Sequence, residues 1–347
     1  MGRCWATMRV AMQPPKLPLA HLPTPLFRSD SLDALVGTRV WVKRDDMTGG
    51  AEAGNKIRKL EYLLAAALEQ GADTVITCGG FQSNHARATA LLARRLGLRP
   101  VLLLRTLASP PPPASTGNAL IDVLAGAELR AISPEQYRRR DALMAEVARE
   151  LAAQGARPYV IPEGGSSGLG SLGYVDAMRE LSEQLARGEQ DAPKQVDAVV
   201  HACGSGGTAA GVALGAARYG VAPSVLAMAV CDDVRYFEGV TTRLIAEARA
   251  LVPDLPDAPA LRIIDAYKGP SYGVATPEQL RFIGDVARAS GLVLDPVYTG
   301  KALFGLSQLP DKPKTAVFVH TGGLPGLFAQ GDALLAAQPN AAVSDRW

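Results

Sequence analysis

Short apolar runs rich in β-branched residues alternate with longer helical patterns along almost the whole sequence. The runs that predict strands are residues 40–43, 74–78, 101–104, 159–161, 198–202, 225–230 and 315–319. The helical patterns between them begin near Lys56, Asn84, Gly117, Pro134, Leu169, Gly207, Val234, Pro277, Gly300 and Gly323. Apolar strands that alternate with helices form parallel sheets covered on both faces, so we expect an α/β protein.

Three segments interrupt this alternation. Residues 162–168 (PEGGSSG) are so rich in glycine that they predict a crossing between domains or a loop close to a ligand. Residues 180–194 are polar and predict an exposed helix end followed by a loop. Residues 109–113 (SPPPP) predict a stiff surface loop. The length of 347 residues is enough for one large or two ordinary domains.

The composition argues against several classes of protein. A net charge of +2, scattered arginines and only 5% aromatic residues give no surface for nucleic acid. No uncharged run is long enough to cross a membrane, and the N-terminal residues lack the apolar core of a signal peptide. Isolated histidines predict no metal site, and isolated cysteines predict reduced thiols, so we expect a soluble cytoplasmic protein. Met8 and Met12 are alternative start residues.

Lys56 has an unusual position for a lysine. Gly54 and Asn55 are turn and N-cap residues, and Leu60 and Leu63 then begin an apolar helical stripe. Lys56 therefore lies in the first turn of a helix, where the helix dipole disfavours a cation. An amine that must lose its proton to form a Schiff base gains from that position, and lysine is sparse here, with 9 against 27 arginines. The alternative is an ordinary solvated helix start.

A glycine-rich turn at residues 204–211 (GSGGTAAG) follows an apolar strand and precedes a helix. Such a turn directs backbone N–H groups and the positive end of the helix at an anion, usually a phosphate. The hydroxyls of Ser205 and Thr208 would add donors. The same glycines fit the dinucleotide fingerprint, with Asp232 or Asp233 near the ribose position, so a nicotinamide-dependent dehydrogenase is an alternative. Against it, the motif lies in mid-chain and leaves the unusual lysine without a role.

Polar residues also follow other predicted strands, at the sheet edge where α/β proteins bind ligands. Residues 82–85 (QSNH) begin a helix, and four polar residues exceed the need of simple N-capping. They predict a site for a carboxylate or a ring hydroxyl. Tyr272 lies in a glycine loop, and Tyr298 comes just before a helix, as does the segment 320–323 (HTGG). For each tyrosine alone, partial burial in the core is the alternative.

Seven motifs together resemble one family, the D-cysteine desulfhydrases and aminocyclopropane-carboxylate deaminases. They are KRDD (43–46), GNKIRKLE (54–61), QSNH (82–85), RPYVIPEGGSS (157–167), GSGGT (204–208), DPVYTGK (295–301) and HTGG (320–323). The resemblance implies pyridoxal 5′-phosphate as cofactor and the two-domain fold type II of the tryptophan synthase β-subunit. It implies a large cofactor-binding domain from residues 1–60 and 165–347, and a small α/β domain from residues 61–164 that carries the SNH segment.

The resemblance also assigns roles to single residues. Lys56 would form the Schiff base with the cofactor, and Tyr272 and Tyr298 would be acid–base groups facing the substrate. The substrate carboxylate would bind at Gln82, Ser83 and Asn84. Asn84 would also hydrogen-bond the ring hydroxyl of the cofactor, and in the deaminases the serine that matches Ser83 attacks the cyclopropane. The cofactor phosphate would be held by Gly204, Ser205, Gly206, Gly207, Thr208 and Lys59.

Thr299 and Thr321 match the desulfhydrases, because the deaminases carry glutamate and leucine at these two positions. A hydroxyl beside the pyridine nitrogen makes the ring a weaker electron sink, which suffices for loss of a thiolate. We therefore expect a homodimer that converts D-cysteine to pyruvate, hydrogen sulfide and ammonia. Alternatives in the family are aminocyclopropane-carboxylate deaminase, cysteate sulfo-lyase and amino-acid racemase. Outside it they are the dehydrogenase and an idle amino-acid-binding relative.

Overall fold

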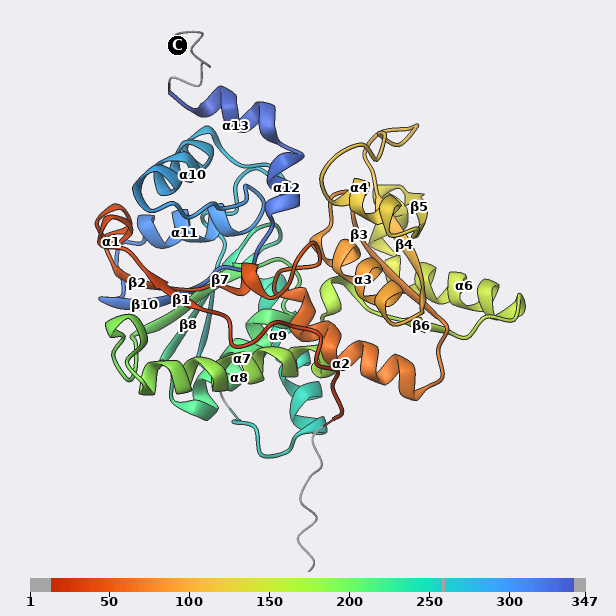
Figure 1. The fold of residues 1–347 in the computed structure, drawn as a ribbon, viewed down its shortest axis with the longest axis horizontal. Coiled ribbons are helices and arrows are strands. Elements are labelled where there is room, and N and C mark those ends of the chain that lie inside the picture. Colours follow the sequence, from red (N-terminus) through yellow and green to blue (C-terminus); the bar gives the residue numbers. More distant parts are fainter. Residues whose placement is uncertain (1–13, 258–259, 340–347) are drawn as a thin grey trace, which may run out of the picture.

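The computed structural model describes residues 14–257 and 260–339, which build two separate sheets (Figure 1). The alternative start residues Met8 and Met12 lie outside these ranges. The larger sheet has the strand order β1-β2-β10-β7-β8-β9, and all neighbours are parallel except β1 and β2. Its strands are β1 (Leu26–Arg28), β2 (Arg39–Lys43), β7 (Ala198–Cys203), β8 (Ser224–Ala229), β9 (Leu261–Ile264) and β10 (Thr315–Val319).

The smaller sheet is wholly parallel, with the order β5-β4-β3-β6. Its strands are β3 (Thr74–Gly80), β4 (Arg99–Arg105), β5 (Glu128–Ile132) and β6 (Pro158–Val160). The predicted boundary between residues 60 and 61 falls inside one helix, α2 (Lys56–Glu69), whose Leu60 and Leu63 both pack into the core of the smaller sheet. The limits of the two domains therefore stay a prediction.

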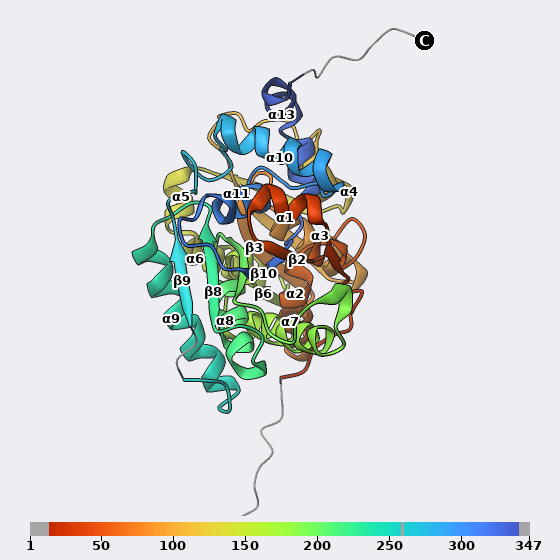
Figure 2. The same ribbon diagram turned by 90° about the vertical axis from the view of Figure 1, so that its left-hand side faces the viewer.

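Helices cover both faces of the larger sheet. The helices of the described residues are α1 (Asp30–Val36), α2, α3 (Asn84–Arg95), α4 (Gly117–Leu124), α5 (Pro134–Arg138), α6 (Arg140–Ala153), α7 (Gly168–Ala186), α8 (Gly207–Tyr219), α9 (Val234–Leu251), α10 (Pro277–Ser290), α11 (Thr299–Gln308), α12 (Leu324–Phe328) and α13 (Gly331–Ala337). Figures 1 and 2 show α10, α11 and α13 on one side of this sheet and α7 and α8 on the other.

Two consecutive residues of β7 show why the sequence of this strand is a continuous apolar run. Side chains alternate between the faces of a sheet. Val199 packs with Tyr174 of α7 on one face, whereas Val200 packs with Phe282 and Leu303 of α10 and α11 on the other. Both valines are buried. A strand buried on both faces has no polar positions, so its period of two is hidden in the sequence.

The α/β prediction is confirmed, and each of the seven predicted strands corresponds to a strand. The strands β1, β5 and β9 were not predicted, and each lies at the edge of its sheet. Edge strands are half exposed, so they carry no continuous apolar run. None of the helices in the described part of the chain has the length and apolar character needed to span a bilayer.

The prediction that residues 180–194 are exposed was wrong for the last turns of α7. Glu180 accepts a hydrogen bond from Arg58 at 3.0 Å, and the amide oxygen of Gln184 accepts one from the Lys43 amine at 2.6 Å. Both polar side chains therefore belong to a buried network beneath α2. A polar residue on a helix end looks solvated in the sequence unless its distant partner is known.

Candidate active site

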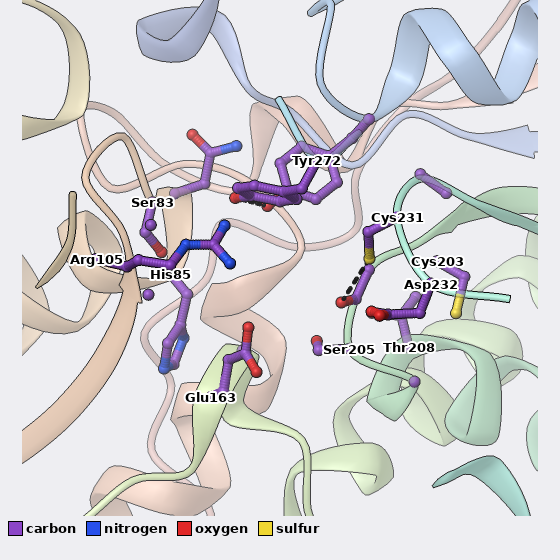
Figure 3. Close-up of a pocket in the computed structure, with 18 of the residues that line it drawn as sticks. Ser83, His85, Arg105, Glu163, Cys203, Ser205, Thr208, Cys231, Asp232 and Tyr272 are labelled. Carbon is purple, nitrogen blue, oxygen red and sulfur yellow. Dashed lines mark hydrogen bonds between the residues drawn. The ribbon is translucent and has the colours of Figure 1, made fainter. Parts of the chain in front are cut away.

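A cavity of about 680 Å³ lies between the two sheets (Figure 3). Three of its lining residues are the last residues of parallel strands: Gly80 of β3, Arg105 of β4 and Cys203 of β7. The carboxyl ends of parallel strands are where α/β proteins bind ligands. Residues from both sheets therefore face one common space.

Lys56 lines this cavity as the first residue of α2. Its amine donates to the backbone oxygen of Gly164 at 3.4 Å. Burial lowers its pKa to about 8, an effect that the nearby Glu163 carboxylate partly opposes. The preceding Asn55 does not cap the helix with its side chain; its amide donates instead to the Thr208 hydroxyl at 3.1 Å. The residue before the lysine is thus joined to the glycine-rich turn by a hydrogen bond.

The glycine-rich turn of residues 204–208 connects β7 to α8 and lines the cavity with all its residues except Gly207. Gly206 has a φ of +82°, a left-handed conformation that favours glycine. The backbone N–H of Gly207 donates to the Ser166 hydroxyl at 3.2 Å, and the Ser205 hydroxyl lies 2.9 Å from the same oxygen. The turn therefore gathers hydroxyl and N–H donors at a helix N-terminus, as an anion site requires.

Lys59 lies beside this turn but below the cavity surface. Its amine donates to Gly164 at 3.2 Å and to Ser166 at 3.4 Å. A Cβ atom on Gly207 would lie 2.8 Å from the Lys59 amine, so only glycine fits there. Burial lowers the pKa of Lys59 well below its usual value, and the charge of Lys56 lowers it further. A bound anion would relieve both effects.

The start of α3 brings Ser83 and Asn84 to the opposite wall of the cavity. The Ser83 hydroxyl caps the helix, and the Asn84 side-chain oxygen accepts a hydrogen bond from Asn118 of α4 at 3.0 Å. Gln82 does not line the cavity, because its side-chain oxygen accepts from the backbone of Asn118 at 2.7 Å. Of the three residues predicted to bind the substrate carboxylate, Ser83 and Asn84 line the cavity, whereas Gln82 is hydrogen-bonded to α4.

Tyr272 and Tyr298 form a hydrogen-bonded pair, with their hydroxyl oxygens 2.6 Å apart. Burial raises the pKa of Tyr272 to about 12, and the hydrogen bond from Tyr298 limits the rise. Burial and the same hydrogen bond raise the pKa of Tyr298 further. Both phenols are therefore neutral at neutral pH.

The two threonines differ in their surroundings. Thr321 lines the cavity, whereas Thr299 is fully buried and does not line it. The Thr299 hydroxyl donates to the Asp295 carboxylate at 2.6 Å and accepts from the backbone N–H of Asp295 at 2.8 Å. The Asp295 carboxylate also accepts the backbone N–H groups of residues 297–299. Thr299 is thus occupied in closing the turn before α11.

Several cavity residues were not singled out from the sequence. Glu163 accepts a hydrogen bond from the Tyr137 hydroxyl and pairs with Arg140 at 2.8 Å. Arg105 lies over the Tyr137 ring, and Ser166 lies between the turn and Lys59. Glycine content drew attention to the segment of Glu163 and Ser166, but nothing in the spacing of these five residues links them before the chain folds.

Comparison with known proteins agrees with this geometry. A family model described as pyridoxal-phosphate dependent enzyme matches residues 17–322. The mitochondrial bifunctional D-cysteine desulfhydrase/1-aminocyclopropane-1-carboxylate deaminase of Arabidopsis thaliana is 42% identical over 346 residues, which cover 97% of this chain and 85% of that protein. A putative 1-aminocyclopropane-1-carboxylate deaminase of Thermotoga maritima is 41% identical over 323 residues, which cover 92% of this chain and 100% of that protein.

Solved structures agree with the sequence comparisons. The crystal structure of a homologue of the deaminase has a TM-score of 0.83 at 38% identity, and the match covers 93% of this chain and 96% of that chain. Maize serine racemase, at 20% identity and a TM-score of 0.60, shares the fold. The dehydrogenase alternative is not supported by these matches. The chain therefore belongs to the pyridoxal-phosphate dependent enzymes, in the family of the D-cysteine desulfhydrases and aminocyclopropane-carboxylate deaminases.

Proposed function

We infer that the protein is a lyase that eliminates hydrogen sulfide from D-cysteine and yields pyruvate and ammonia. The observation that carries this proposal is one cavity that holds an amine with a lowered pKa, Lys56, together with a neutral pair of phenols, Tyr272 and Tyr298. Elimination from a β-substituted amino acid needs a base at Cα and an acid at the leaving group. The name of the Arabidopsis relative includes this activity.

The residues around the glycine-rich turn fit the phosphate of the cofactor. Gly207 has no room for a side chain between Ser166 and the Lys59 amine, and backbone N–H groups begin α8 at that point. Residues 204–208 with Lys59 would hold the phosphate, Lys56 would carry the cofactor, and Asn84 would bind its ring hydroxyl. When bound, the cofactor supplies the electron sink for the carbanion at Cα.

Proton removal, carboxylate binding and proton donation are assigned to different side chains. Lys56 would remove the Cα proton of the bound substrate, because its pKa of about 8 leaves an appreciable neutral fraction near neutral pH. Ser83, Asn84 and the N-terminus of α3 receive the substrate carboxylate, and Gln82 supports them by fixing α4. Tyr272 donates a proton to the departing sulfur, with Tyr298 stabilising its oxygen.

Deamination of the cyclopropane acid is the second candidate, since the Thermotoga relative is named for it. Elimination is favoured by the surroundings of Thr299. Its hydroxyl and the neighbouring Asp295 carboxylate are both engaged by hydrogen bonds within the turn, so neither is a free acid for a pyridine nitrogen. We propose Thr299 and Thr321 as the residues on that side of the cofactor. Cysteate sulfo-lyase activity is a further outcome of the assay below, and racemase activity would be detected by the appearance of the opposite enantiomer. A homodimer with the predicted domain limits is proposed from family resemblance alone, and a cytoplasmic location from the composition and the isolated cysteines.

The test compares products from several amino acids with purified, cofactor-loaded protein. Pyruvate and sulfide are measured with D-cysteine and L-cysteine, sulfite with cysteate, and keto acid with the cyclopropane acid. We expect D-cysteine to have the highest kcat/KM. Tyr272→Phe should lower that value by about 100-fold, the range of general acid catalysis. If the cyclopropane acid were converted faster than D-cysteine, the proposed function would be wrong and the protein would be a deaminase.

A further inference from the structure

The guanidinium of Arg105 extends from the end of β4 into the cavity, between Ser83, Tyr272 and Glu163 (Figure 3). Within residues 14–257 and 260–339, its side chain has neither a hydrogen-bond acceptor nor a carboxylate partner within salt-bridge distance, although it is half-buried. Arginine in such a place normally pairs with an acid, because an unpaired buried charge is costly. Its five N–H donors are therefore available to a ligand.

Two aromatic rings fix the orientation of this guanidinium. Its central carbon lies 4.5 Å from the ring centre of Tyr137 and 5.4 Å from that of Tyr272. Contacts with ring faces stabilise a cation without using its hydrogen-bond donors. Glu163, an acid of the cavity wall, is already paired with Arg140 and bonded to Tyr137. Arg105 is thus held in place by rings while its charge remains unmatched.

The position of Arg105 places it beside Tyr272. In the β3–β4 register Arg105 is paired with Gly80, three residues before Ser83, and the Tyr272 ring lies against Gly80, 3.1 Å from where a Cβ would be. Arg105 therefore shares its side of the cavity with Tyr272, the residue assigned above to the leaving group. A substrate whose carboxylate binds at α3 would direct its side chain toward this pair.

We propose that Arg105 is the receptor for a negatively charged group on the side chain of the substrate, so that the cavity binds amino acids with a carboxylate or sulfonate beyond Cβ more tightly than their uncharged isosteres. A planar guanidinium accepts either group through two parallel hydrogen bonds. The proposal rests on the proposed function for the orientation of the substrate. It extends that function from cysteine to acidic β-substituted amino acids.

The test measures binding of amino acids that differ only in side-chain charge. Aspartate and asparagine are nearly isosteric, so the ratio of their dissociation constants isolates the charge; both enantiomers, and cysteate as the sulfonate, are titrated by calorimetry into cofactor-loaded protein. The wild type should bind aspartate more tightly than asparagine. Arg105→Met should weaken aspartate and cysteate by roughly 10- to 100-fold, the range for a charged hydrogen bond, and change asparagine by less than about threefold.

Arg138→Met is the matched control, because Arg138 lines the same cavity but is 72% exposed and pairs with Glu135. It should leave all ratios within about threefold of the wild type, since exposed charges contribute little. Equal losses of aspartate and asparagine in Arg105→Met would overturn the proposal, as would unchanged aspartate binding. The binding readout does not depend on turnover. If the protein released no sulfide from D-cysteine but still bound aspartate more tightly than asparagine, only the proposed function would be contradicted.

Discussion

Two lysines one helical turn apart share a single backbone acceptor, the carbonyl oxygen of Gly164. They differ in access: Lys56 borders the cavity, whereas Lys59 is 1% exposed. Each ammonium raises the free-energy cost of protonating the other amine. The pair is therefore suited to one neutral amine and one charged amine beside an anion. The same residue type thus has two roles that depend on a single turn of α2.

Substitution separates these roles. Lys56→Ala should abolish sulfide release and the visible absorbance of covalently attached cofactor while the protein stays folded. Lys59→Ala should keep that absorbance but weaken cofactor affinity by roughly 10- to 100-fold, because a charge-assisted hydrogen bond to phosphate is lost. Cofactor titration and circular dichroism measure both outcomes. If the absorbance were retained in Lys56→Ala and lost in Lys59→Ala, Lys59 would be the lysine that attaches the cofactor and Lys56 the one beside the phosphate.

The pH dependence of cofactor attachment follows from the pKa of Lys56, which burial lowers to about 8. Only the neutral amine attacks an aldehyde, and its fraction grows about tenfold per pH unit below the pKa. Incorporation into the cofactor-free protein should therefore accelerate up to pH 8 and level off above it. Absorbance after rapid mixing gives the rate. A rate that continued to rise toward pH 10 would indicate an unperturbed lysine.

At the scale of elements, the cavity depends on loops that are held by buried polar side chains. Lys301 of α11 is 1% exposed, and its amine donates to the backbone oxygens of Lys268 at 2.6 Å and Ser271 at 2.9 Å. Both residues lie just before Tyr272, in the loop that carries it. The lysine of the DPVYTGK motif therefore acts on the loop of a distant tyrosine and not on the ligand.

Removal of this amine should disturb the tyrosine pair. In Lys301→Met the partly buried carbonyls of Lys268 and Ser271 lose their donor, at a cost of up to about 1–3 kcal/mol each. We expect a lower melting temperature, and a lower kcat for D-cysteine with little change in cofactor affinity. Lys312→Met, in the loop before β10, is the control and should change neither quantity. Normal kcat in Lys301→Met would mean that the loop keeps its position without this anchor.

How far the sequence predicts these elements depends on where their partners lie. Buried strands such as β7 and helix starts such as Lys56 carry local signals, so they were predicted. The edge strands β1, β5 and β9 were missed because part of their surface is solvated, whereas the edge strand β6 was predicted from its short apolar run. Asn55 was predicted as a helix cap, yet its side chain bonds Thr208, which is 153 residues away. Contacts of that kind, including the pairing of Glu163 with Arg140, have no local pattern from which to infer them.

At the scale of the whole molecule, a buried ionic network lies beneath the helix that carries Lys56. Arg58 of α2 is 1% exposed, donates to Asp45 at 2.9 Å and pairs with Glu180 of α7 at 3.0 Å. Asp45 also accepts a hydrogen bond from Tyr174 at 2.7 Å. The network therefore joins the segment after β2, the start of α2 and the helix α7 of the larger sheet.

Breaking this network should destabilise the fold more than the loss of a surface pair. Arg58→Met leaves Asp45 buried without its ion-pair partner, and Glu180 with Lys43 alone, and breaking a buried pair in this way typically costs about 3–5 kcal/mol in the free energy of unfolding. Arg157→Met, which removes an exposed pair with Asp73, should cost less than about 1 kcal/mol. Urea denaturation measures both. A loss of stability in Arg58→Met no larger than in Arg157→Met would show that the network contributes little.

The contacts of Ser166 have a thermodynamic consequence. Its hydroxyl, in the segment that follows the smaller sheet, meets the N–H of Gly207 and the Ser205 hydroxyl in the turn that follows β7 of the larger one. A phosphate bound among these groups touches segments from both sheets, and only the folded chain brings them together. Ligand binding and folding are then linked, and each tenfold rise in free cofactor above its dissociation constant adds about 1.4 kcal/mol of stability. A cofactor bound at this place would therefore stabilise the contact between the segments of the two sheets as well as take part in the reaction.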